Sequence, residues 1–160
     1  MGELSALPTI LIVEDNQNDI ELLRQRFADA RLINPRRVVR DGAEAIDYLS
    51  GRGKYADREK FPLPGIVLLD LAMPKRDGFE VLAWIRARQE FDQMPVIILS
   101  VHSEDPMIQR ARRLGADSYL IKGVDMEGLL HLLTNAFLGW ALVPVPGAAP
   151  AHHSPMAQLV

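Results

Sequence analysis

The chain has 160 residues, a formal net charge of −3 and no cysteine. This length suits one globular domain, disulfides and cysteine ligands are excluded, and the lack of a basic excess argues against a nucleic-acid-binding surface. Residues 1–5 show neither the basic nor the apolar stretch of a signal peptide, and no apolar run approaches the ~20 residues of a membrane helix. We therefore expect a cytoplasmic protein that binds neither nucleic acid nor membrane.

After a lead-in over residues 1–8, short apolar runs alternate five times with segments of helical apolar spacing. The runs are rich in Ile, Val and Leu without polar alternation, which is typical of parallel strands covered on both faces. Strict alternation of strand and helix predicts one α/β domain over residues 9–143, with a parallel sheet between two layers of helices. The expected strands are 9–13, 37–40, 65–70, 95–99 and 117–121.

Two segments interrupt this alternation. Residues 51–64 carry glycine at one end, prolines at the other and dense charge between, which predicts a long exposed loop. Loops of this length are uncommon and tend to be functional, so Tyr55 and Phe61 are candidate anchors for a partner protein, with a plain insertion as the alternative. Residues 144–160 are rich in proline and alanine, and we expect a disordered tail there.

Polar residues follow the apolar runs where the strands are expected to end. Glu14 and Asp15 follow the first run, Asp70 the third, Ser100 the fourth and Lys122 the last. The carboxyl ends of parallel strands share one edge of the sheet, so these groups are expected to converge. Carboxylates this close repel one another unless a cation joins them, and oxygen donors without His or Cys favour Mg²⁺ or Mn²⁺.

This set of groups favours phosphoryl transfer onto Asp70. A carboxylate can act as nucleophile and form an aspartyl phosphate, while Lys122 and a metal ion neutralise the phosphoryl oxygens. The Ser100 hydroxyl is placed to hydrogen-bond one of those oxygens. A structural salt bridge between the acids and Lys122, and a simple cap at Ser100, are the alternatives.

Four motifs follow one another on this five-unit pattern: Val13-Glu14-Asp15, residues 69–74 with Asp77-Gly78, residues 98–100 and residues 115–122. With these motifs, residues 9–138 resemble a response regulator receiver domain of bacterial two-component signalling. The resemblance implies a flavodoxin-like (βα)5 fold with strand order 2-1-3-4-5. The long 51–64 segment, the motifs at 41–45 and 47–49, and the stand-alone arrangement resemble the regulators partnered with phytochrome-type histidine kinases, so Tyr55 and Phe61 would contact the kinase.

The resemblance also implies roles at the strand ends. Asp70 would be the phosphoacceptor, and Mg²⁺, with Mn²⁺ as a substitute, would be bound by Asp15, by Asp70, by Glu14 through water and by the backbone carbonyl of Ala72. Lys122 would be the phosphate partner.

Five positions complete the comparison with the family. Ser100 and Tyr119 would be the switch pair. Ala72 and His102 occupy positions that tune dephosphorylation. Gly123 stands where the family usually has a proline, so the conformation after Lys122 is open.

The function implied is a single-domain response regulator that is phosphorylated by a histidine kinase and acts on an unknown downstream protein. It would catalyse only its own phosphorylation and slow self-dephosphorylation. A phosphate-independent adaptor of the same fold is the alternative. A metal-dependent phosphatase is disfavoured, because Ala72 stands where an aspartyl-nucleophile phosphatase places its second acid, two residues after Asp70.

The last expected helix, residues 125–142, has more apolar residues than one buried stripe requires. The surplus predicts a two-fold homodimer, because contiguous exposed apolar surface marks interfaces. The alternative is that Trp140 folds back onto its own domain. The expected interface residues are Leu129, Leu132, Leu133 and Trp140.

Overall fold

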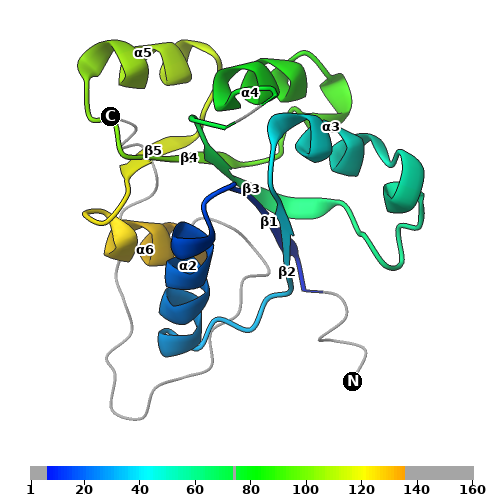
Figure 1. Ribbon diagram of the computed structural model, residues 1–160, viewed down its shortest axis with the longest axis horizontal. Coiled ribbons are helices and arrows are strands. Elements are labelled where there is room, and N and C mark those ends of the chain that lie inside the picture. The colour runs from blue at the N-terminus through cyan, green and yellow to red at the C-terminus, as the bar shows by residue number, and fades with distance from the viewer. Residues whose placement is uncertain (1–6, 74, 136–160) are drawn as a thin grey trace.

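The computed structural model describes residues 7–73 and 75–135. Its centre is a parallel sheet of five strands in the order β2-β1-β3-β4-β5 (Figure 1). This order and the helices on both faces confirm the predicted flavodoxin-like α/β fold. The strands are β1 (Thr9–Val13), β2 (Arg36–Val39), β3 (Pro64–Asp70), β4 (Val96–Ser100) and β5 (Ser118–Ile121).

The helices form two layers. Three of them cover one face of the sheet, and α2 and α6 cover the other (Figure 1). Alternate side chains of β3 supply the two layers: Val67 and Leu69 pack with the three-helix layer, while Ile66 and Leu68 pack with α2 and α6. The helices are α2 (Gln17–Asp29), α3 (Gly42–Ser50), α4 (Gly78–Arg86), α5 (Asp105–Arg113) and α6 (Met126–Asn135).

Side-chain caps start three helices directly after loops that follow strands. Asn16 accepts a hydrogen bond from the backbone N–H of α2 at 3.0 Å, Asp41 does so for α3 at 2.8 Å and Asp77 for α4 at 2.9 Å. The helix α5 begins without such a side-chain cap. Glu104 is the N-cap residue there, it makes no side-chain cap bond, and a proline lies in the first turn.

Residues 51–64 are mostly exposed, as the charge pattern predicts, but they are not a plain loop. They contain the 3₁₀ helix η1 (Gly53–Ala56), and Tyr55 is only 5% exposed. The Tyr55 ring lies 4.9 Å from the Tyr48 ring and 5.0 Å from the Phe61 ring, measured between centroids. This aromatic cluster packs on the core, so Tyr55 is unavailable as the kinase anchor that we expected.

Arg58 ties this segment to the end of α3. Its guanidinium donates to the backbone carbonyls of Tyr48 at 2.8 Å, Leu49 at 2.9 Å and Phe61 at 3.2 Å. The first two carbonyls belong to the last turn of α3, where helices leave acceptors without intrahelical partners. Arg58 is thus a side-chain cap supplied from a distance in sequence.

The burial of α6 corrects the expected dimer interface. Leu129 and Leu133 are both 0% exposed and pack in the core beneath α2 and α6, because they form the single stripe that covers the sheet. Leu132 is partly buried against the same cluster. Trp140, the boundary at residue 143 and the expected tail lie outside the described residues. A dimer through Leu132 and Trp140 stays a prediction.

A further helix, η2 (Gln89–Phe91), follows α4 and precedes β4. Within residues 7–73 and 75–135, no helix combines the length and the apolar character needed to cross a membrane.

Candidate functional site

The strand ends bring the predicted groups to one edge of the sheet. Glu14 directly follows β1, Asp70 ends β3, Ser100 ends β4 and Lys122 directly follows β5. Glu14, Asp15 and Asp70 each offer a carboxylate oxygen, and these oxygens lie within 4.8 Å of one another. The predicted convergence is therefore present in the structure.

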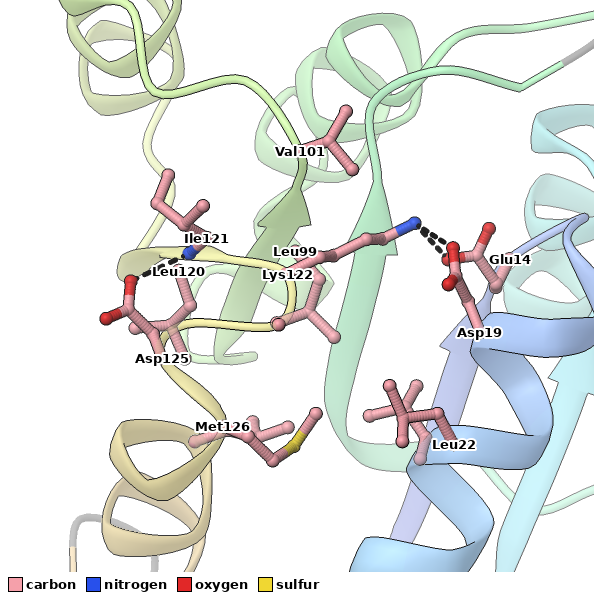
Figure 2. A pocket seen from close by; sticks show the side chains of 13 residues that line it. Glu14, Asp19, Leu22, Leu99, Val101, Leu120, Ile121, Lys122, Asp125 and Met126 are labelled. Atoms are coloured by element: carbon pink, nitrogen blue, oxygen red, sulfur yellow. Dashed lines mark hydrogen bonds and ion pairs between the residues drawn. The ribbon is translucent and has the colours of Figure 1, made fainter.

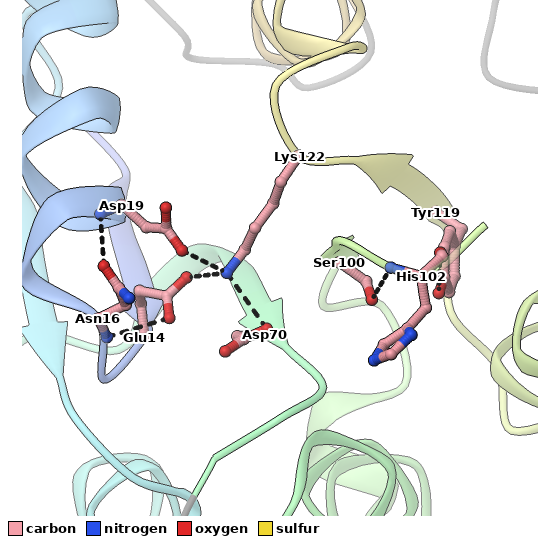
Figure 3. Close-up of polar contacts among 8 residues, drawn as sticks. All are labelled: Glu14, Asn16, Asp19, Asp70, Ser100, His102, Tyr119 and Lys122. Carbon is pink, nitrogen blue, oxygen red and sulfur yellow. Dashed lines mark hydrogen bonds and ion pairs between the residues drawn. The ribbon is translucent and has the colours of Figure 1, made fainter.

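Lys122 reaches across this edge to three carboxylates (Figure 3). Its Nζ donates to Glu14 Oε1 and to Asp19 Oδ2, the latter at 2.9 Å, and lies 3.3 Å from Asp70 Oδ1. Glu14 and Asp19 accept hydrogen bonds from this ammonium, whereas Asp70 is an ion-pair partner. Asp19 was not among the predicted site residues. Its signal in the sequence is an acid in the first turn of the helix that follows Glu14.

Burial and charge shift the pKa values of this cluster in a consistent way. Burial raises the pKa of Glu14 to about 7, helped by the negative charge of Asp70 and opposed by the hydrogen bond from Lys122. Burial alone would lower the pKa of Lys122, but its hydrogen bonds to Glu14 and Asp19 and the charge of Asp70 outweigh this and raise it. One ammonium is shared by several carboxylates, so the site is short of positive charge.

The donor set fits a hard divalent cation. Glu14 is 2% and Asp70 7% exposed, whereas Asp15 is exposed, so the cluster opens to solvent on one side. All three offer oxygen, and Mg²⁺ and Mn²⁺ prefer a few carboxylates together with waters. Ala72 lies in the loop directly after β3, two residues after Asp70.

Ser100 and Tyr119 are joined through the backbone of His102 (Figure 3). The Ser100 Oγ accepts a hydrogen bond from the His102 N–H at 3.1 Å, and the Tyr119 hydroxyl donates to the His102 carbonyl at 2.8 Å. Tyr119 is buried, which raises the pKa of its hydroxyl. The Tyr119 side chain thus lies inside the fold in this structure. The His102 imidazole instead lies 3.5 Å from Glu104.

The turn after Lys122 explains the glycine at position 123. Gly123 has φ +80°, in the left-handed region that favours glycine. A proline has φ near −65° and could not take this conformation. Lys122 is nevertheless held in place, because the Lys122 backbone N–H donates to the Ser100 carbonyl at 2.8 Å.

Gly78 supports the other side of the site. Its N–H donates to the Leu71 carbonyl at 3.0 Å, and a Cβ at this position would lie 2.3 Å from the Asp70 carbonyl oxygen. The start of α4 therefore packs directly on the backbone of Asp70.

A groove of about 230 Å³ adjoins Lys122 (Figure 2). It lies between α2 and the β5–α6 turn, with Glu14 and Asp19 at one end. Its walls are mostly apolar and include Leu22, Leu99 and Met126. The edge of the sheet that carries Asp70 thus continues into an apolar surface on the α2 side.

Comparison with known proteins agrees with this geometry. Residues 10–134 match the family of the response regulator receiver domain. The chain belongs to this family. This receiver domain is 33% identical to the response regulator Rcp1 of Synechocystis sp. (strain ATCC 27184 / PCC 6803 / Kazusa). The alignment spans 141 residues, which are 87% of this chain and 93% of Rcp1.

Two solved structures of similar proteins contain a phosphoryl group or a metal ion. The phosphorylated cyanobacterial phytochrome response regulator RcpA is 35% identical, with a TM-score of 0.69 over 79% of this receiver domain's chain and 89% of RcpA. The Mn²⁺-bound form of Rcp1 has a TM-score of 0.72 and 27% identity over 86% of this chain and 99% of that one. The receiver domain is thus related to phytochrome response regulators, and a relative binds a divalent metal.

Proposed function

We propose that this receiver domain is a phosphorylation switch that accepts a phosphoryl group on Asp70 from a histidine kinase. The observation that carries the proposal is the position of Asp70: a nearly buried carboxylate 3.3 Å from the Lys122 Nζ, within a cluster of acids that suits a divalent cation. The relationship to RcpA and to other phytochrome response regulators favours a phytochrome-type histidine kinase as the partner.

The transfer uses the chain's own groups in defined ways. An oxygen of Asp70 attacks phosphorus, the P–N bond of the kinase phosphohistidine breaks, and the imidazole leaves with the bond's electron pair. The Lys122 ammonium, which faces the Asp70 carboxylate in this structure, is placed to form an ion pair with one phosphoryl oxygen. The Ser100 hydroxyl is placed to donate a hydrogen bond to another. A bound Mg²⁺, or Mn²⁺ in its place, would supply positive charge to the phosphoryl oxygens, held by Glu14, Asp15, Asp70 and the carbonyl of Ala72.

The test is metal-dependent phosphorylation of the purified chain. With acetyl phosphate and Mg²⁺ we expect intact-mass spectrometry to show one added phosphoryl group, and with excess EDTA none. Borohydride reduction of the acyl phosphate, followed by peptide mapping, should place the label at Asp70. Labelling that persists in EDTA, or that maps to another residue, would overturn the proposal.

The contacts of His102 suggest how phosphorylation of Asp70 would change the position of Tyr119. A phosphoryl oxygen that binds the Ser100 hydroxyl would displace the His102 backbone, and Tyr119, which is hydrogen-bonded to the His102 carbonyl, would move with it. This is a shift between two populated states and not a refolding. The same movement would reach the face formed by α5 and β5.

Ser100→Ala should separate phosphorylation from this response. The chain has three tyrosines, so 3-fluorotyrosine labelling should give three ¹⁹F resonances. On adding beryllofluoride and Mg²⁺ we expect the Tyr119 resonance to shift in the wild type and in the nearby exposed control Ser103→Ala. In Ser100→Ala the chain should still accept phosphate while the Tyr119 shift falls to a small fraction. An unchanged shift in Ser100→Ala would contradict the coupling.

A further inference from the structure

A second pocket lies away from the phosphoacceptor edge, between α2 and the edge strand β2. Its volume is about 250 Å³. Three aliphatic side chains and two arginines line it, and no acidic residue does. The lining residues are Ile12, Ile20, Arg24, Arg36 and Val38. None of them belongs to the cluster around Asp70, so this pocket has no role in the proposed phosphoryl transfer.

The guanidinium of Arg36 is held in position but is incompletely bonded. It lies over the Phe27 ring, with the Cζ 5.2 Å from the ring centroid, and one Nη donates to the Leu32 carbonyl. Its Nε–H is buried and has no hydrogen-bond acceptor within the described part of the chain. Nearly all buried polar groups in folded proteins have a partner, so an unpaired donor on a fixed side chain beside a pocket points to a missing acceptor.

The charge around the pocket points to the same conclusion. Arg24 forms an exposed ion pair with Glu21 at 2.9 Å, whereas Arg36 has no ion pair with any carboxylate of the described residues. Burial, and to a smaller extent the nearby Arg24 cation, lower the pKa of Arg36. The pocket therefore holds two neighbouring guanidiniums and a deficit of negative charge.

We propose that this pocket binds a small oxyanion, a carboxylate or a phosphate, on a short aliphatic body. The planar guanidinium offers N–H donors in the arrangement that carboxylates and phosphates accept. Arg36 supplies a guanidinium at the pocket wall, Arg24 supplies the second cation at the rim, and Ile12, Ile20 and Val38 supply walls for a few methylene groups. Because Arg36 is already fixed by Phe27 and Leu32, little ordering is required when the anion binds.

The Arg36 Nε–H is a direct reporter for the test. In ¹H–¹⁵N spectra recorded with EDTA, which excludes metal-dependent binding at Asp70, we expect its resonance to shift saturably with sodium butyrate. Inorganic phosphate should also shift it, and a weaker response than to butyrate would show that the aliphatic walls contribute. The n-butylammonium ion has the same chain and the opposite charge, and it should leave the resonance unchanged.

Three variants decide between a built site and general attraction to positive charge. Arg24→Gln should weaken butyrate binding by about tenfold, as expected for a lost charge-assisted contact. Arg36→Gln should abolish butyrate binding. Because this variant lacks the Nε–H reporter, binding is monitored through the methyl resonances of Ile20. Arg26→Gln removes the same charge from α2 outside the pocket and should have no effect. Shifts that fail to saturate, or that are equal in the Arg24 and Arg26 variants, would overturn the proposal.

Discussion

Replacing Asp70 by asparagine is expected to abolish phosphoryl incorporation from both acetyl phosphate and a histidine kinase. Asparagine keeps the shape of the side chain at the end of β3 but lacks a nucleophilic carboxylate oxygen. The surrounding groups cannot take over, because Glu14 is engaged by Lys122 and Asp15 lies outside the buried part of the cluster. Intact-mass spectrometry after incubation with acetyl phosphate and Mg²⁺ measures the result.

The same variant should be more stable than the wild type without metal. Asp70 adds negative charge beside Glu14, and this repulsion is relieved in Asp70→Asn at the cost of one contact with Lys122. We expect the free energy of unfolding in EDTA to rise by about 1 kcal/mol, the scale of one pKa unit. Asp92→Asn, an exposed change far from the cluster, is the matched control. It should alter neither phosphoryl incorporation nor the free energy of unfolding. Full labelling of Asp70→Asn would refute the assignment of the phosphoacceptor.

Gly78→Ala is expected to be the most destabilising small substitution near the site. A Cβ would lie 2.3 Å from the Asp70 carbonyl oxygen and 2.8 Å from the Leu71 Cα. Both are backbone atoms of the strand end, so relief requires that β3 and α4 move apart. We expect a loss of about 3 kcal/mol in the free energy of unfolding. Urea denaturation followed by circular dichroism measures this loss, and phosphorylation should slow because Asp70 is displaced.

Gly128→Ala is the matched control for that experiment. Gly128 lies inside α6, and the nearest atom to its Cβ would be a Leu120 methyl at 3.8 Å, an ordinary contact. Alanine is the better helix former, so this variant should gain up to about 1 kcal/mol. If Gly78→Ala were as stable as the wild type, the close packing of α4 on the Asp70 backbone would be disproved.

The sheet and its order of elements were predictable because the information is local. Runs such as 66–69 and 96–99 are apolar throughout, and capping residues such as Asp41 and Asp77 stand directly before their helices. The 51–64 segment was not predictable in this way. Its conformation depends on the contacts of Tyr55 with Tyr48 and Phe61, and charge density alone does not reveal a buried tyrosine in a charged stretch.

The site was predictable where strand ends define it and less so elsewhere. Glu14, Asp70, Ser100 and Lys122 converge because parallel strands share an edge. Asp19 escaped prediction, since its reach to Lys122 depends on the register of α2 above the sheet and not on its own strand. The surplus of leucines on the last helix likewise could not be divided into buried and exposed residues before the side that faces the sheet was known.

The side-chain cap that Arg58 forms on the end of α3 affects how the 51–64 segment should behave in solution. The segment carries four sites for trypsin, at Arg52, Lys54, Arg58 and Lys60. A free loop of this composition would be cut quickly. Here the bonds from Arg58 and the buried Tyr55 make the segment and α3 one cooperative unit, so cleavage and amide hydrogen exchange in η1 should occur only when that helix opens as well.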